Sequence, residues 1–111
     1  YLDLFAGKND HEAVKRAGAG GHKEINRTNL TTEQMEEALK KPVVARQLEL
    51  LRFRGTCPAF AKESKIIVNS NDNHMEFIWE NAGYQAKLTA DLKTCEYMIT
   101  ETTPDGQTRT L

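Results

Sequence analysis

The chain has 111 residues, of which 39% are apolar and 28% charged, enough for one modest domain or for the end of one domain and a small second one. Its 15 basic and 16 acidic residues give a net charge of −1, which argues against a nucleic-acid-binding protein and gives no reason to expect a membrane partner. Cys57 and Cys95 stand in no zinc-binding pattern, so we expect no metal site and two reduced thiols in a cytoplasmic protein.

The chain opens on an apolar run, residues 1–6, followed by a glycine and a polar turn over residues 7–10. Apolar residues on both faces are typical of a strand buried inside a parallel sheet. No later part of the chain repeats the strand–helix alternation that such a sheet needs. We therefore predict that residues 1–6 are an interior strand whose neighbours belong to a larger protein.

A polar, glycine-rich loop is predicted over residues 11–29, beginning with a short helix over residues 11–17 that a run of glycines ends. Cations and amide donors in a loop just past the C-terminal end of a strand suit a phosphate, carboxylate or sugar hydroxyl ligand. A merely solvated loop has a similar composition, so that alternative stays open. The candidate binding residues are Asn9, Asp10, His22, Lys23, Asn26 and Arg27.

Residues 30–54 predict two helices. Thr31 is a good N-cap, and Gln34 stands three residues on, as a capping box requires. Pro42 opens the second helix, where its missing N–H costs nothing. The spacing of Val44, Leu48 and Leu51 predicts that these three form its apolar face.

Residues 64–111 change to a period of two, with apolar and polar residues alternating between turn-forming clusters. This pattern predicts four or five antiparallel strands in meander order, with one polar face. Trp79 alternates with the apolar Met75 and Phe77, which favours a core position for it over a sugar-stacking one. The boundary before this β module is predicted near residues 60–62.

Five ordered matches resemble the C-terminal part of sucrose phosphorylase and its relatives, the glycoside phosphorylases of the α-amylase superfamily (glycoside hydrolase family 13). The matches cover about residues 1–60 and are weak over the β module. The first two together, at their loop spacing, are specific. In order they are residues 6–10 (Ala-Gly-Lys-Asn-Asp), 24–27 (Glu-Ile-Asn-Arg), 42–44 (Pro-Val-Val), 51–54 (Leu-Arg-Phe-Arg) and 59–60 (Ala-Phe).

The resemblance implies an α+β fragment: the last strand and helix of a (β/α)8 barrel, followed by a small antiparallel all-β C-terminal domain. Residues 1–61 would be the end of the catalytic barrel, comprising its last strand, the substrate-side loop and the final helices. Residues 62–111 would be the β domain.

The resemblance also implies an activity. These enzymes cleave an α-glucoside such as sucrose with phosphate, retain the configuration and give α-glucose 1-phosphate, using an aspartate nucleophile and a glutamic acid/base. Both carboxylates belong to earlier barrel strands, so this chain would hold no catalytic residue and be inactive alone. The implied partners are the sugar substrate and inorganic phosphate, with no cofactor.

One departure from the family pattern concerns the acceptor. Sucrose phosphorylases carry Gly-Arg-(Asp/Glu) before Ile-Asn-Arg, whereas this chain has His22-Lys23-Glu24. Lysine keeps the positive charge but lacks the bidentate fork of arginine. We therefore expect an acceptor other than plain fructose, and an anionic one such as glycerate suits a His/Lys pair. Glucosylglycerol and sucrose 6′-phosphate are further substrates of related phosphorylases.

Two other readings compete with the enzyme segment: a non-catalytic carbohydrate-binding or structural β module with a helical arm, and a self-contained α+β interaction domain. Leu2, Leu4 and Phe5 discriminate between a self-contained domain and a fragment. In a self-contained domain they should be buried within the chain or pair with the β module, whereas in a fragment they should be exposed, paired with another copy or disordered. A fragment also predicts self-association through its exposed barrel-facing apolar surface.

Overall fold

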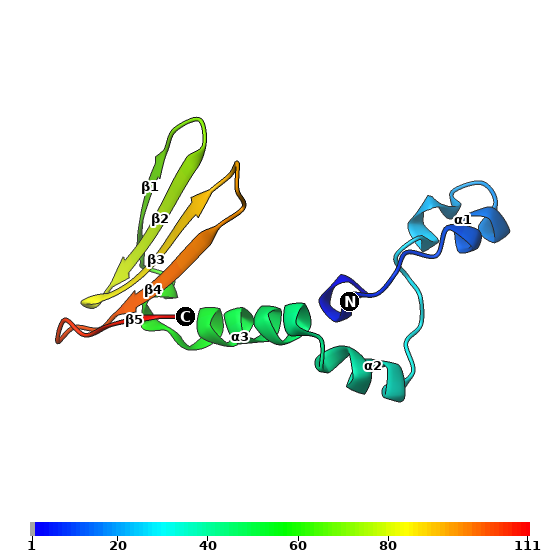
Figure 1. The fold of residues 1–111 in the computed structure, drawn as a ribbon, viewed down its shortest axis with the longest axis horizontal. Helices are drawn as coiled ribbons and strands as arrows, with labels where there is room; N and C mark the ends of the chain where they lie inside the picture. The colour runs from blue at the N-terminus through cyan, green and yellow to red at the C-terminus, as the bar shows by residue number, and fades with distance from the viewer. Residues whose placement is uncertain (1) are drawn as a thin grey trace. The chain divides into compact units, whose positions relative to one another are not determined.

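The computed structural model describes residues 2–111, with helices in the first half and an antiparallel sheet in the second (Figure 1). The helical elements are η1 Asp3–Phe5, α1 His11–Ala17, η2 Gly21–Glu24, α2 Thr32–Leu39, α3 Pro42–Thr56 and η3 Pro58–Phe60, where η marks a 3-10 helix. The strands are β1 Lys65–Ser70, β2 His74–Asn81, β3 Tyr84–Asp91, β4 Tyr97–Thr102 and β5 Thr108–Thr110.

The chain divides into two compact units, one ending at Arg52 and the other spanning Phe53–Leu111. The boundary therefore lies inside α3, ahead of the division predicted between residues 61 and 62. The last turn of α3 and the 3-10 helix η3 contribute to the core of the second unit. The assignment of residues 1–61 to a barrel and 62–111 to a β domain stays a prediction.

The strand predicted over residues 1–6 is not formed in the part of the chain that the structure describes, and Tyr1 lies outside that part. Residues 3–5 form η1 instead, with the Phe5 N–H donating to the Leu2 carbonyl at 3.2 Å and the Ala6 N–H to the Asp3 carbonyl at 3.0 Å. A strand satisfies its backbone groups only through a neighbouring strand, and residues 2–52 contain none. Hydrogen bonds within local turns therefore satisfy the backbone N–H and C=O groups of this segment.

The exposure expected for the opening residues was wrong for Leu2. Its side chain is only 1% exposed, while Leu4 and Phe5 are half-buried. The turn folds Leu2 back over Gly7, where a Cβ would collide with the leucine side chain. Burial of one residue by a local turn does not require a self-contained domain.

The helices begin where the sequence predicts. The Thr31 hydroxyl accepts from the Gln34 N–H at 3.2 Å, and the Gln34 side chain accepts from the Thr31 N–H at 2.9 Å, so the predicted capping box of α2 is confirmed. In α3 the predicted apolar face is only partly buried: Val44 is fully buried, but Leu51 is 57% exposed. Phe53 takes the core position instead, because the end of α3 packs on the sheet.

The sheet confirms the predicted meander, with strand order β1-β2-β3-β4-β5 and every neighbouring pair antiparallel. The β2–β3 hairpin turns through Ala82 and Gly83, both at positive φ. Two consecutive positive φ values give the turn whose twist matches that of antiparallel strands. The alternating register therefore gathers most apolar residues of β1 to β4 on one face, whereas Ile67, Ile78 and Met98 fall on the other.

The core of the second unit lies where this apolar face meets the end of α3 and η3. Phe53, Cys57, Ala59 and Ala86 are buried there, and Trp79 packs against this cluster as predicted. The Phe60 ring contacts the rings of both Phe53 and Trp79, at centroid distances of 5.5 Å and 5.1 Å. These aromatic contacts fix η3 over one half of the face.

The other half of the apolar face is open in this unit. Ile66, Val68 and Tyr97 are at least half exposed, although the pairing register puts them on the same side as Trp79 and Ala86.

Among the described residues, no helix has the length and apolar character needed to cross a membrane.

Candidate functional site

The candidate binding residues lie in a closed loop of the first unit, built from α1, η2 and the turns on either side of them (Figure 1, blue to cyan). The Asp10 N–H donates to the Ile25 carbonyl at 2.8 Å, which joins the two ends of the loop. Since Asn9 and Asn26 are the chain neighbours of these two residues, the bond brings both amide side chains to the same end of the loop. The sequence alone did not predict this closure.

Asp10 holds α1 in place through its carboxylate. Oδ1 accepts from the Ala13 N–H at 2.9 Å, and Oδ2 accepts from Arg16 Nη2 at 2.9 Å. The backbone hydrogen bond from Ala13 and the Arg16 guanidinium lower the pKa of the Asp10 carboxyl. Both carboxylate oxygens are therefore engaged by the helix that Asp10 caps.

Gly21 lets η2 lie directly against α1. A Cβ at this position would collide with the Val14 carbonyl oxygen and would lie 3.0 Å from the Ala17 Cβ. Gly18 and Gly20 adopt positive φ in the turn between the two elements, as glycine does at low cost. The glycine run therefore provides both the tight turn and the close packing of the loop.

The remaining candidates present polar groups to solvent. His22 and Lys23 lie on η2 and are exposed, as are Asn9 and Asn26, and within residues 2–111 none of these four side chains has a hydrogen-bond or ion-pair partner. Arg27 differs, because its Nη1 lies 3.3 Å from Glu24 Oε1. The loop thus offers an ammonium group, an imidazole and two amides as available donors to a polar or anionic ligand.

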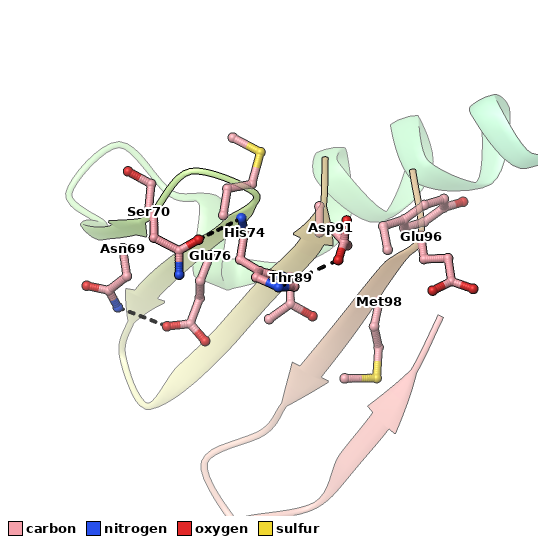
Figure 2. Close-up of a pocket in the computed structure, with 12 residues that line it drawn as sticks. Asn69, Ser70, His74, Glu76, Thr89, Asp91, Glu96 and Met98 are labelled. Carbon is pink, nitrogen blue, oxygen red and sulfur yellow. Dashed lines mark hydrogen bonds and ion pairs between the residues drawn. The ribbon is translucent and has the colours of Figure 1, made fainter. Parts of the chain in front are cut away.

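A depression of about 590 Å3 lies at one end of the sheet near the β1–β2 and β3–β4 turns (Figure 2). Its polar groups are engaged with one another. His74 Nε2 lies 3.6 Å from Asp91 Oδ2, and Glu76 contacts Asn69 at 2.9 Å and Lys87 at 3.1 Å. Sequence analysis missed this depression because its residues follow the ordinary alternation of a strand.

The carboxylates of this depression have structural contacts. Asp91 accepts from the Lys93 and Thr94 N–H groups at 2.8 and 2.9 Å, and these bonds lower its pKa. Hydrogen bonds from Asn69 and Lys87 likewise lower the pKa of Glu76. Among the described residues, no three or more His, Cys, Asp or Glu side chains are grouped so as to hold a metal ion.

No family model matches the chain. Individual curated relatives and a solved structure do match it along its whole length. A sucrose 6(F)-phosphate phosphorylase of Ilumatobacter coccineus is 48% identical over 111 residues, and a glucosylglycerol phosphorylase of Marinobacter adhaerens is 36% identical over 112. A crystal structure of sucrose 6F-phosphate phosphorylase from Thermoanaerobacter thermosaccharolyticum matches all of the chain with a TM-score of 0.85 and 35% identity.

The chain spans about a fifth of the length of these proteins: 21% and 23% of the two curated relatives and 22% of the solved chain. It is therefore homologous to one segment of the glycoside phosphorylases. More particularly, it belongs to the sucrose phosphorylase-like proteins and corresponds to a fragment of them. Its fold is an α+β fragment whose five-stranded sheet matches the C-terminal domain of the solved structure.

Proposed function

We propose that this chain is the substrate-side loop, final helices and β domain of a retaining glycoside phosphorylase. The whole enzyme would transfer glucose from an α-glucoside to phosphate and release α-glucose 1-phosphate. The observation that carries the proposal is the match along all 111 residues to a curated phosphorylase at 48% identity. The catalytic carboxylates would lie outside this chain, which would contribute the loop that bears Asn9, His22, Lys23, Asn26 and Arg27.

The acceptor that best suits this loop is anionic. His22 and Lys23 are exposed on one short 3-10 helix, and in the described chain their side chains have no protein partner. Hydrogen bonds between a cation and an anionic oxygen are roughly twice as strong as neutral ones. A neutral sugar would gain little from this pair, whereas a phosphorylated or carboxylated acceptor would gain a charge-assisted contact.

Within the anionic acceptors we favour a sugar phosphate over glycerate. Two curated relatives, 48% and 36% identical over the segment that matches this chain, carry sucrose 6(F)-phosphate in their names. A phosphate ester carries a charge of about −1.5 to −2 at neutral pH and three acceptor oxygens, so it offers a lysine more than one carboxylate does. Sucrose 6(F)-phosphate, which carries its phosphate on the fructose unit, is accordingly the proposed glucoside, and fructose 6-phosphate the proposed acceptor.

Acceptor preference tests this proposal in the full-length protein that contains the chain. With α-glucose 1-phosphate as donor, we expect fructose 6-phosphate to be used in preference to fructose, glycerate and glycerol. Lys23→Ala should raise KM for fructose 6-phosphate about 10- to 100-fold, as expected for the loss of one hydrogen bond to a charged group. Lys23→Arg should keep most of the affinity, since the charge remains.

Lys40→Ala is the matched control, because Lys40 is an exposed lysine of the same unit that pairs with Glu37. It should leave the kinetics unchanged. A preference for unphosphorylated fructose, together with a normal KM in Lys23→Ala, would refute an anionic acceptor. Absence of any transfer from α-glucose 1-phosphate would refute the phosphorylase itself.

Self-association stays a prediction for the 111-residue chain by itself, as does a cytoplasmic location. The sequence assigns self-association to the barrel-facing apolar surface of the first unit. The open half of the sheet face, around Ile66, Val68 and Tyr97, is a second exposed apolar surface, and we propose that it contributes. Sedimentation velocity should show a species larger than a monomer, and Val68→Lys should shift it toward the monomer, because a charge cannot be buried there cheaply. Leu92→Lys, at an equally exposed leucine in the β3–β4 turn, is the control.

A further inference from the structure

We propose that Asp10 is a positioning residue: it closes the loop over residues 10–25 and so holds His22 and Lys23 where the acceptor binds. This inference rests on the proposed function. Sequence analysis grouped Asp10 with the ligand-contacting candidates, and the contacts of the folded loop support an indirect role instead.

The first contact closes the loop at its base. The Asp10 N–H donates to the Ile25 carbonyl at 2.8 Å, although fifteen peptide bonds separate the two residues. Compact surface loops of roughly 6–16 residues with adjoining ends are often built around such contacts. Closure at the base removes most of the freedom that η2 would otherwise have relative to the start of the loop.

The second set of contacts fixes the helix inside the loop. The Asp10 carboxylate accepts from Ala13 at the first turn of α1 and from Arg16 at its last turn, both at 2.9 Å. One side chain thus holds a seven-residue helix at both of its ends. A helix this short is not stable without such anchoring.

The third contact positions η2 against α1. Gly21, the first residue of η2, packs so closely on Val14 and Ala17 of α1 that no side chain fits between them. His22 and Lys23 follow Gly21 directly in the chain. The path from the Asp10 carboxylate to His22 and Lys23 therefore runs through α1 and its close contact with Gly21.

The same geometry argues against direct ligand contact by Asp10. Both of its oxygens are engaged by the protein, and the hydrogen bonds that engage them also lower its pKa, which keeps the group ionised at neutral pH. An ionised carboxylate would in any case repel a phosphorylated acceptor. A residue that only positions the loop tolerates replacement by another capping residue, whereas a ligand contact does not.

Steady-state kinetics of the full-length protein, with α-glucose 1-phosphate and fructose 6-phosphate, test the inference. Asp10→Ala removes the cap and the Arg16 pair, and we expect KM for fructose 6-phosphate to rise about 10-fold, the equivalent of one lost cap. Asp10→Asn keeps a good N-cap and should recover most of that affinity. Gly21→Ala, which separates η2 from α1, should raise the same KM, and Asp72→Ala, in the exposed β1–β2 turn, should have no effect.

Hydrogen exchange gives a readout that does not depend on turnover. Amides in a peptide covering residues 8–27 should exchange faster in Asp10→Ala and in Gly21→Ala than in wild type, with Asp10→Asn close to wild type. This measurement remains informative if the Ala variant loses activity altogether.

Two results would overturn the positioning role: an unchanged KM in Asp10→Ala, or an Asp10→Asn variant as impaired as Asp10→Ala, since asparagine keeps the Ala13 cap on which the positioning role depends. Either result alongside a raised KM in Lys23→Ala would leave the proposed function standing. A normal KM in Lys23→Ala with fructose preferred over fructose 6-phosphate would instead refute the anionic acceptor.

Discussion

Replacing Phe53 by alanine should lower the free energy of unfolding of the second unit by about 3–5 kcal/mol, the usual cost of removing a buried phenylalanine ring. Phe53 is 8% exposed and packs edge-on against Phe60, which in turn contacts Trp79. Loss of the ring would leave a cavity beneath η3 that small neighbours such as Ala59 and Ala86 cannot fill. The effect is comparable to the whole stability of a small domain.

Urea unfolding followed by the fluorescence of Trp79, the one tryptophan of the chain, measures this effect. Leu51→Ala is the matched control, since Leu51 lies two residues earlier in α3 and is 57% exposed; it should change the free energy of unfolding by no more than about 0.5 kcal/mol. Phe53→Leu should lower the free energy of unfolding far less than Phe53→Ala. It can be measured even if the alanine variant does not fold. Equal effects of Leu51→Ala and Phe53→Ala would contradict the packing of α3 described above.

The second large effect concerns the ion pair between Glu101 and Arg109. Glu101 is 9% exposed on the apolar face of β4, and its Oε2 accepts from Nε and Nη2 of Arg109, both at 2.6 Å. The arginine side chain is 69% exposed. Arg109→Met should therefore lower the free energy of unfolding by about 2–3 kcal/mol, because it leaves a buried carboxylate without its cation. Glu101→Gln should cost less, because the guanidinium can be hydrated.

A double-mutant cycle measured by urea unfolding separates the pair from its parts. The variant with both substitutions should be more stable than Arg109→Met alone, since the unpaired charge is then gone. Purely additive effects would show that the pair contributes nothing beyond its two separate side chains.

The Cys57 thiol lies in the same core, where burial raises its pKa. It should therefore stay protonated and resist alkylation by iodoacetamide at pH 8, while the exposed Cys95 reacts.

Features set by local chemistry could be predicted from the sequence. The capping box of α2 depends on Thr31 and Gln34 alone, and the strands follow from alternation over a few residues. The role of Asp10 as an N-cap was also within reach, because a cap three residues before Ala13 is a local pattern. The composition of the loop does not separate this capping role from ligand contact, because Asp10 stands among polar residues of both kinds.

Features set by distant partners could not be predicted. Residues 2–6 have the composition of a strand, but a strand forms only beside another strand, and the described first unit offers none. The buried face of α3 depends on which residues the sheet covers, so Phe53 is buried whereas Leu51, predicted for the apolar face, is exposed. The function of the loop around His22 and Lys23 depends on the rest of the enzyme in the same way.

The order of the strands has a consequence for how the second unit acquires its structure. Every strand pairs with the strand next to it along the chain, so no strand pairing joins segments that are distant in sequence. Chains whose contacts are mostly between sequence neighbours fold faster than those that need long-range pairings. The sheet should accordingly assemble by successive addition of hairpins, and stopped-flow refolding should show Trp79 reaching its native fluorescence in a single fast phase.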